Sequence, residues 1–141
     1  MSLDVSIIVV SKDDAADLPV SLGSALAQRG AKCETLLVDN ASADESREVG
    51  RGLGARVLTQ VENVGFAAAM NAGIEASTVR YVLALNPDCR LEPDFAATLM
   101  SAFAVLSSIT RPSLSSSRIA ASALVSKLLC TIAQFSVKLV P

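Results

Sequence analysis

Residues 81–88 read YVLALNPD and place a carboxylate directly after a run of apolar residues. The apolar run, Tyr81–Leu85, is bounded by polar and turn residues, which predicts a buried parallel strand. Asp88 then lies at the carboxyl end of that strand. Open α/β sheets bind ligands at this edge, and a carboxylate there can hold a divalent cation against a phosphate. The alternative is an ordinary turn built from Asn86, Pro87 and Asp88.

Strand and helix patterns alternate through the first 100 residues. Further buried strands are predicted at residues 5–10, 35–38 and 56–59, and helices at 18–26, from a capping box at 42–45 to about Arg51, and at 66–76. Three glycines at residues 50, 52 and 54 follow a helix and precede a strand, which is the wrong order for a dinucleotide fingerprint and indicates a helix C-cap and turn. The order predicts an α/β fold with a parallel sheet and helices on both faces.

Polar groups follow three of the predicted strands, and in a parallel sheet the loops that carry them share one edge. These loops are Ser11–Asp14, Asp39–Asn40 and Asn86–Asp88. Asp39 could accept a hydrogen bond from a nucleobase or ribose, or it could cap the following helix. The loop before the 66–76 helix has a different logic, because Gly65 allows close backbone approach ahead of free helical N–H groups that suit an anion. Asn71, two turns into that helix, either joins such a site or packs.

Composition limits the other possible functions. The length of 141 residues and the 51% hydrophobic content suit one domain with a real core, and a net charge of −2 without a basic run argues against nucleic acid as a partner. The absence of histidine excludes histidine triads and imidazole metal sites. Three cysteines at irregular spacing fit a reducing cytoplasm, and we expect no secretory signal. We also expect no transmembrane segment, because Lys127 and Lys138 interrupt the apolar residues near the end of the chain.

Four motifs in order resemble the N-terminal half of family 2 glycosyltransferases, especially the rhamnosyltransferase-like branch. They are Val5–Ser11, Val38–Ser42, Asn63–Asn71 and Leu85–Asp88. The resemblance runs from about Val5 to Phe95 and implies a Rossmann-like GT-A fold that binds a nucleotide-diphosphate sugar, with UDP or dTDP as the nucleotide. It further implies a transfer to a glycan or lipid-linked acceptor, and a cytoplasmic protein that could lie at the inner face of the membrane.

The resemblance also implies the residues of the site. The implied substrate-binding residues are Val10, Ser11, Asp13, Asp39, Asn63, Gly65, Asn71, Asn86 and Asp88. Asp88 stands for the acid of the family's Asp-x-Asp motif, which holds Mg²⁺ or Mn²⁺ against the pyrophosphate leaving group. The first loop of such proteins usually reads Ser-Tyr-Asn, whereas Lys12 and Asp13 stand at its second and third positions here. Lys12 could contact the diphosphate or be an ordinary surface lysine.

A change in composition near residue 100 sets the end of the chain apart. All 14 acidic residues and all 7 glycines precede it, whereas residues 101–141 carry four basic residues and ten serines. We therefore predict a nucleotide-sugar-binding domain at residues 1–100 and a Ser-rich apolar tail at 101–141. Inverting transfer needs a base to take the acceptor proton, and no acid follows Asp94, so we assign no catalytic residue.

These observations lead to the hypothesis of a truncated enzyme whose tail is out of frame or otherwise unrelated to the family. Two alternatives stay open. One is a sugar-nucleotide-binding module without chemistry. The other is a half-enzyme that needs a partner chain, with its tail pairing as an amphipathic helix or touching the membrane through Leu124, Leu128, Ile132 and Phe135.

Translation of the downstream DNA in the other two reading frames tests the hypothesis of a frameshift. We expect one frame to continue the family pattern with a paired acidic motif, because that half supplies the general base in this class of enzyme. If neither frame shows such a continuation, the frameshift is refuted.

Overall fold

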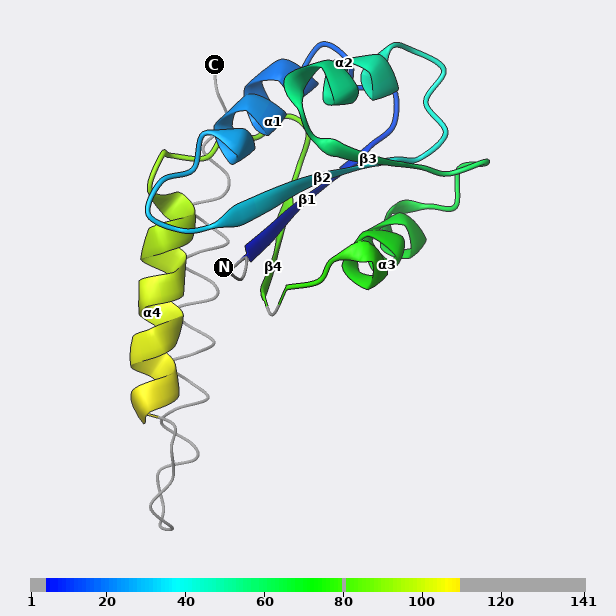
Figure 1. Cartoon of the computed structure of the whole chain (residues 1–141). Helices are drawn as coiled ribbons and strands as arrows, with labels where there is room; N and C mark the ends of the chain where they lie inside the picture. Colours follow the sequence, from blue (N-terminus) through cyan, green and yellow to red (C-terminus); the bar gives the residue numbers. More distant parts are fainter. Residues whose placement is uncertain (1–4, 80, 110–141) are drawn as a thin grey trace.

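The structure is a computed structural model, and it describes residues 5–79 and 81–109. Four strands form one parallel sheet in the order β3-β2-β1-β4 (Figure 1). The elements in chain order are β1 (Val5–Ser11), α1 (Leu18–Leu26), β2 (Cys33–Asp39), α2 (Ser46–Leu53), β3 (Arg56–Thr59), α3 (Phe66–Ala76), β4 (Tyr81–Leu85) and α4 (Phe95–Ile109). The predicted α/β fold with a parallel sheet is confirmed.

Strand β1 is the centre of the sheet. It pairs with β2 over seven residues and with β4 over five, and every one of its residues is buried. Because helices cover both faces, the strand carries β-branched residues on both sides, interrupted by Ser6, instead of an alternating pattern. This explains why residues 5–10 could be recognised as a strand from the sequence.

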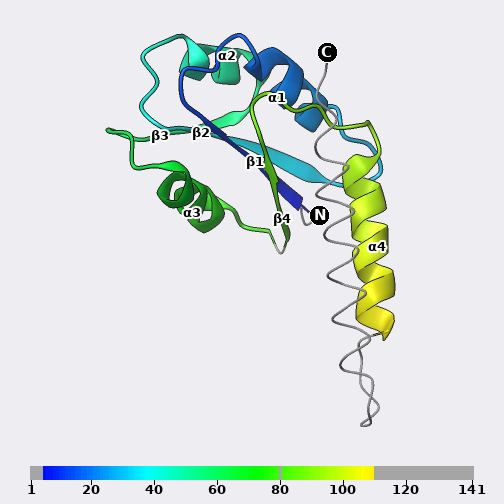
Figure 2. The same cartoon turned by 180° about the vertical axis from the view of Figure 1, so that it is seen from behind.

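Helices lie on both sheet faces, as predicted (Figures 1 and 2). On one face, α1 contributes Leu18 and Leu22 to a core with Ile7 and Leu37. On the other face, α3 lays Ala69 against β1 and β2. The two cores stabilise the same two central strands from opposite sides, so the sheet edge that carries the loops is held from both faces.

Helix α2 begins later than the capping box predicted. It runs from Ser46 to Leu53, and its N-cap residue Glu45 makes no side-chain capping bond. The Ser42 hydroxyl instead accepts a hydrogen bond from the backbone N–H of Asp13, 29 residues away. A tertiary partner has therefore taken the group that would cap a local helix, and the predicted start at residues 42–45 is wrong.

The end of α2 follows the sequence more closely. Gly54 is the C-cap in the left-handed conformation, with φ of 93°, and its N–H donates to the Arg51 carbonyl at 3.1 Å. Glycine adopts this conformation at no steric cost, which confirms the predicted C-cap. The other two glycines, Gly50 and Gly52, lie inside the helix, which runs two residues past the predicted end at Arg51.

The strand order creates a topological switch point. The chain moves outward from β1 through β2 to β3 and then crosses to the opposite side of β1 to form β4. Loops that leave β1 and β4 therefore diverge at their carboxyl ends and leave a crevice between them. In open α/β sheets this is the position where ligands bind.

The predicted domain boundary at residue 100 falls inside α4, which runs unbroken from Phe95 to Ile109. Tyr81 of β4 stacks on Phe103 of α4, with ring centroids 5.5 Å apart. The tail and its predicted amphipathic segment lie otherwise outside the described residues. None of the helices in the described part of the chain is long and apolar enough to cross a membrane.

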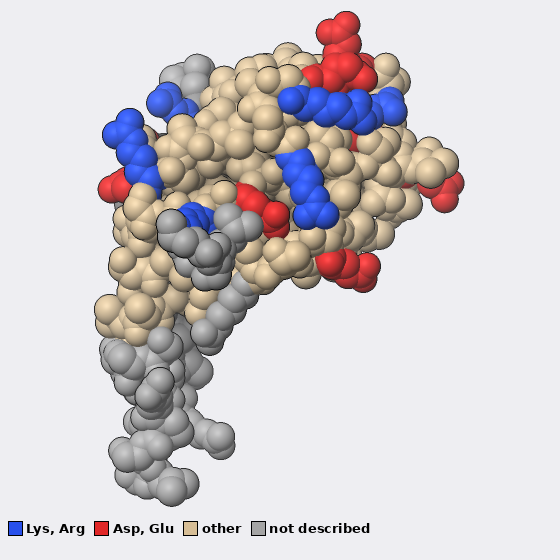
Figure 3. Space-filling model, in the orientation of Figure 1, with Lys and Arg blue, Asp and Glu red and all other residues tan. Residues whose placement is uncertain are grey.

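Charge is dispersed over the face of the molecule shown in Figure 3. Basic and acidic side chains of the described residues both occur there, in places next to each other, and neither kind gathers into one large patch. Surface charge on this face therefore does not mark a ligand site, and the shape of the sheet edge is the better guide.

Two helical glycines in different surroundings make a matched test of this arrangement. A Cβ at Gly73 of α3 would lie 2.8 Å from Ile8 Cγ2 and 3.0 Å from Val38 Cγ2, two stiff β-branched side chains of the sheet, whereas a Cβ at Gly23 of α1 meets nothing within 4 Å. We expect Gly73→Ala to lower the free energy of unfolding by about 1–2 kcal/mol, because overpacking outweighs the gain in helix propensity.

Gly23→Ala should raise the free energy of unfolding by about 0.5–1 kcal/mol, since only the helix propensity changes. Urea denaturation followed by circular dichroism measures both variants. Equal effects of the two substitutions would show that α3 does not pack against β1 and β2 as closely as described.

Candidate functional site

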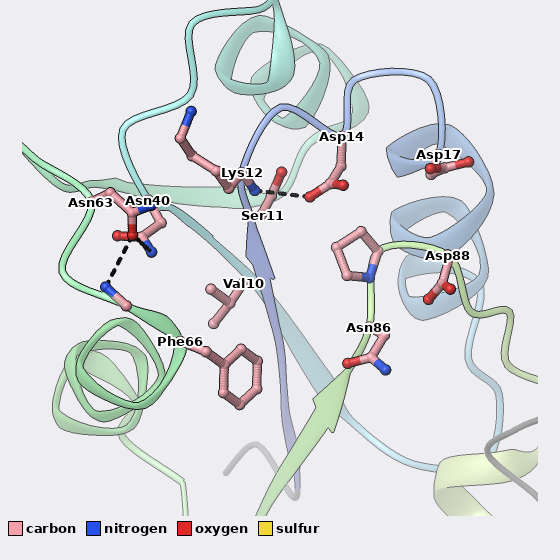
Figure 4. A pocket seen from close by; sticks show the side chains of 12 residues that line it. Val10, Ser11, Lys12, Asp14, Asp17, Asn40, Asn63, Phe66, Asn86 and Asp88 are labelled. Atoms are coloured by element: carbon pink, nitrogen blue, oxygen red, sulfur yellow. Dashed lines mark hydrogen bonds between the residues drawn. The ribbon is translucent and has the colours of Figure 1, made fainter.

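A cavity of about 630 Å³ opens at the carboxyl edge of the sheet, at the switch point (Figure 4). Its walls come from the ends of β1, β2 and β4 and from the start of α3. The lining residues are Val10, Ser11, Lys12, Asp14, Asp17, Asn40, Asn63, Gly65, Phe66, Asn86, Pro87 and Asp88. The three loops that were predicted to share one edge therefore meet around one concavity.

The structure brings six of the nine predicted site residues to this cavity. They are Val10, Ser11, Asn63, Gly65, Asn86 and Asp88. Asp13, Asp39 and Asn71 do not line it. Their roles, like those of the six, stay predictions, but the structure shows what the outlying three do instead.

Asp39 is fully buried behind the cavity wall. One carboxylate oxygen, Oδ2, accepts the backbone N–H of Ser42 at 3.3 Å and lies 3.4 Å from Arg47 Nε. The Asp39 side chain thus stabilises the start of the loop after β2. This role is similar to the alternative in which Asp39 caps the following helix. Asn71 projects from α3 as an exposed residue away from the lining.

Asp13 joins the loop after β1 to the loop after β2. Its backbone has a φ of 60°, its N–H donates to Ser42 Oγ at 3.0 Å, and its carboxylate accepts the N–H of Ala43 at 2.6 Å. The ion pair with Lys12 and the bond from Ala43 hold the pKa of the Asp13 carboxyl below its ordinary value. The Asp13 side chain therefore bonds to other residues of the protein and does not line the cavity.

Two further contacts complete this connection between the loops. The backbone N–H of Asp14 donates to Ser46 Oγ at 3.2 Å, and that of Ala15 donates to Asp44 Oδ2 at 2.9 Å. Bonds from the Ser46 hydroxyl and from Ala15 lower the pKa of the Asp44 carboxyl. The four contacts between the two loops fix the backbone that presents Ser11, Lys12 and Asp14 to the cavity.

Asn40 is one of the lining residues that sequence reasoning did not assign to the site. Its side chain is buried, donates from Nδ2 to Asn63 Oδ1 at 2.8 Å and accepts the N–H of Val64 at 3.0 Å. The Asn63 oxygen also accepts the N–H of Gly65 at 3.0 Å. This amide pair ties the end of β2 to the start of α3. The alternation of side chains along a strand could have pointed to Asn40, because it directs the side chains of residues 39 and 40 to opposite sides.

Two buried oxygens in this region have no hydrogen-bond partner among the described residues: Ser11 Oγ and Asp39 Oδ1. Ser11 and Asp39 are paired in the register of β1 and β2, and Ser11 lines the cavity although its residue is only 1% exposed. A buried polar atom without a partner costs about 1–3 kcal/mol. Ser11 Oγ is such an atom in the wall of a cavity, and it indicates a ligand that supplies the missing bond.

Charge in the cavity is unbalanced. Lys12 is the one cationic residue in the lining, and Asp14, Asp17 and Asp88 are the anionic ones. Lys12 is already paired with Asp13, and Asp14 Oδ2 accepts the backbone N–H of Lys12 at 2.8 Å. Asp88 is exposed, and its Oδ1 accepts a long contact of 3.6 Å from the Cys89 thiol. An anionic ligand would need a cation of its own to enter this cavity.

The residues fit such a cation only in part. No three Asp, Glu or Cys side chains within the described ranges converge on a metal position. The exposed Asp88 can supply one carboxylate ligand, and Mg²⁺ commonly binds through one or two carboxylates with substrate phosphates and water completing its shell. The site therefore suits a divalent cation that arrives with a diphosphate, and it does not form a cage for the cation alone.

The lining residues outside the prediction are Lys12, Asp14, Asp17, Asn40, Phe66 and Pro87. All but Asp17 are next to a predicted site residue in the sequence, so the correct loops were found but not all of the side chains that line the cavity. Phe66 carries the clearest missed signal, since a large aromatic residue at the start of a helix beside a flexible glycine invites a functional interpretation. It was taken simply as the first residue of the helix.

The fold and the cavity define the class of protein, an α/β protein with a ligand site at the switch point of a parallel sheet. The model of the family "Glycosyl transferase family 2" matches residues 6–107. The chain therefore belongs to glycosyl transferase family 2, which confirms the resemblance at the level of the family; the rhamnosyltransferase-like branch stays a prediction.

A curated relative and several solved structures agree with this assignment. The succinoglycan biosynthesis protein ExoO of Rhizobium meliloti is 32% identical over 94 residues, which are 64% of this chain and 27% of that protein. TarS of S. aureus superposes with a TM-score of 0.63 at 21% identity, over 75% of this chain and 33% of the TarS chain. The mannosyltransferase PcManGT of Pyrobaculum calidifontis gives 0.58 at 22% identity, over 64% of this chain and 30% of that one.

These structural similarities confirm the GT-A glycosyltransferase fold. TarS has been solved with UDP-GlcNAc, and PcManGT with GDP-Man and Mn²⁺. Glucosyl-3-phosphoglycerate synthase of Mycobacterium tuberculosis, solved with Mn²⁺ and UDP, has a TM-score of 0.62 at 17% identity and covers 72% of this chain and 40% of its own. The present chain spans about a quarter of the length of its curated relative and about a third of these structures.

The contacts between the loops after β1 and β2 predict a loss of stability in acid. The pKa values of Asp13 and Asp44 are lowered by folding, so the unfolded chain takes up protons first as the pH falls. Their contribution is complete above the ordinary aspartate pKa of about 4 and is lost as the pH falls through the lower folded values. We expect the melting temperature to drop below about pH 4.

Asp44→Asn should reduce that drop, since the variant lacks one of the two groups. Glu75→Gln, which removes an exposed carboxylate of α3, is the matched control and should keep the wild-type pH profile. Calorimetric melting between pH 6 and pH 3 measures all three chains. A drop in Asp44→Asn as large as in the wild type would exclude this hydrogen-bonded carboxylate as a source of the acid sensitivity.

Proposed function

We propose that the cavity binds a nucleotide-diphosphate sugar together with Mg²⁺ or Mn²⁺, as the donor site of a glycosyltransferase that acts on a glycan or lipid-linked acceptor. The single observation that carries this proposal is the buried, unpartnered Ser11 hydroxyl in the wall of the same cavity that Asp88 lines. A nucleotide offers hydrogen-bonding groups at its base and ribose end and negative charge at its diphosphate end. The cavity has an unpartnered hydroxyl at the end of β1 and a carboxylate after β4, which suit these two ends of a nucleotide.

The end of the cavity near β1 and β2 suits the base and ribose. Ser11 Oγ can donate or accept one hydrogen bond, and Asp39 Oδ1 lies behind it as a second unpartnered oxygen. A ligand N–H or hydroxyl that reached these atoms would relieve two buried polar groups at once. Asp39 needs a small adjustment of the wall for this role, because it is fully buried in the described state.

The end of the cavity near β4 suits the diphosphate. Asn86 and Asp88 flank Pro87 just after the strand, and the lining carries three carboxylates and one ammonium group. A bound divalent cation neutralises the pyrophosphate leaving group during transfer. Asp88 would supply one ligand to that cation, and the fixed loop after β1 would exclude part of the surrounding water.

Transfer itself needs more than donor binding. An inverting transfer requires a base within reach of the acceptor hydroxyl, and we assign no such base among the described residues. The proposal for this chain is therefore donor binding, with UDP or dTDP as the predicted nucleotide. A cytoplasmic site, at the inner face of a membrane or away from it, stays a prediction of the sequence.

Titration calorimetry of the 141-residue chain with UDP, in the presence and absence of Mn²⁺, tests the proposal. We expect Mn²⁺ to be required for tight binding. Asp88→Ala should weaken UDP binding by about 10- to 100-fold in the presence of Mn²⁺, because a charge-assisted contact worth about 1.5–3 kcal/mol is lost. UDP titrated without Mn²⁺ should distinguish the two chains much less.

Glu75→Gln serves as the control for net charge, because it removes an acidic group from an exposed position of α3 outside the cavity lining. It should bind UDP and Mn²⁺ as the wild type does. Wild-type affinity in Asp88→Ala would remove Asp88 from the site, and a wild-type chain that binds no nucleotide diphosphate would overturn the proposed function.

A further inference from the structure

Phe66 differs from the other aromatic residues of the described chain. Tyr81 and Phe103 stack on each other, and Phe95 packs against the core beside α1. Phe66 is 57% exposed, although it lines the cavity at the switch point. An aromatic ring that is exposed to water does not gain the free energy of hydrophobic burial. An exposed ring in the lining of a cavity therefore indicates a ligand that covers it.

The backbone holds Phe66 in place before any ligand binds. Gly65, just before it, has φ of 82° and ψ of 162°, a conformation that a residue with a side chain rarely adopts, and this sets the direction in which α3 begins. The N–H groups of Val64 and Gly65 donate to the side chains of Asn40 and Asn63. The ring is thus presented from a fixed helix start, and little ordering is left to be done on binding.

The position of the ring selects the part of the ligand that it meets. Phe66 belongs to the α3 side of the cavity and Asp88 to the loop after β4, and Figure 4 shows Phe66 beside Val10, apart from Asp88. If Asp88 marks the diphosphate end, the ring lies toward the base end. Val10 adds an apolar side chain next to it, and this is a surface for a flat aromatic group and not for a phosphate.

We propose that Phe66 is the stacking platform for the nucleobase of the bound nucleotide. This inference rests on the proposed donor site and adds to it a ligand-contacting residue. Stacking on an aromatic ring tolerates every base, because each base has a π-face. Phe66 would therefore supply affinity for UDP, dTDP and GDP alike, while the choice between bases would fall to hydrogen-bonding groups such as Ser11 Oγ.

The test compares ligands with and without a base on the full chain. With Mn²⁺ present, Phe66→Ala should weaken UDP, dTDP and GDP binding by about tenfold or more, by calorimetry, and leave inorganic pyrophosphate binding unchanged. Phe66→Tyr should bind all four ligands as the wild type does, because the ring is kept. Phe66→Leu, which keeps apolar bulk without the ring plane, should fall between the two for the nucleotides.

Ile74→Ala is the matched control, because Ile74 is another exposed apolar residue of α3 but lies outside the cavity lining. It should bind every ligand as the wild type does, and melting curves should show that all variants remain folded. Unchanged UDP binding in Phe66→Ala would overturn the platform. Equal losses for UDP and pyrophosphate would overturn it as well, since the ring would then act on the diphosphate or on the loop.

Two further outcomes separate this inference from its foundation. A loss confined to UDP-GlcNAc, with UDP unaffected, would place the sugar on the ring and refute stacking of the base. Wild-type binding of UDP that Asp88→Ala weakens and Phe66→Ala does not would refute the platform and leave the proposed function standing. A wild-type chain that binds none of these ligands refutes both.

Discussion

Parallel pairing of β1 with β2 on one side and β4 on the other is the constraint on which the site depends. Because these three strands point the same way, the loops after them leave the sheet at one edge. The direction change from β3 to β4 then opens the crevice between two of those loops. Because β1 is buried on both faces, any change in this pairing would also disrupt the core. The shape of the cavity therefore depends on the core as well as on the loops.

The sequence was sufficient to place elements and loops but not to orient every side chain. Continuous apolar runs indicated the strands, and the ranges 66–76 and 81–85 coincide with α3 and β4. The prediction that β4 is buried was wrong, because only Leu85 of that strand is buried. The capping box at residues 42–45 failed because Ser42 bonds to Asp13 from a distant loop. Local patterns do not contain such partners. Asp39 was predicted as an acceptor for a base or ribose and Asp13 from the resemblance, yet the Asp13 carboxylate joins the two loops and the Asp39 carboxylate bonds within the loop after β2.

The loops after β1 and β2 contain an uncommon backbone conformation at residues that are not glycine. Asp13 and Ala41 both adopt positive φ values, 60° and 61°, which are uncommon for residues other than glycine. Such conformations persist where surrounding contacts determine them. Here the hydrogen bonds that backbone N–H groups of the loop after β1 donate to the side chains of Ser42, Ser46 and Asp44 do so. The backbone strain is therefore located next to the lining residues Lys12, Asp14 and Asn40 and not in the lining itself.

The charge of the cavity leads to a final step about how its ligand is held. Protein groups supply Lys12, already paired with Asp13, against three carboxylates, so the wall by itself repels a diphosphate. A single exposed carboxylate such as Asp88 is also a weak ligand for a bare cation. The cation alone finds few ligands in the cavity, and the diphosphate alone meets mostly negative charge. When both are bound, each is a binding partner for the other. Binding of the two should therefore be mutually dependent, with a coupling free energy that is the same from either side. A neutral stacking surface at the other end of the cavity would act on the base alone and would not share in that coupling.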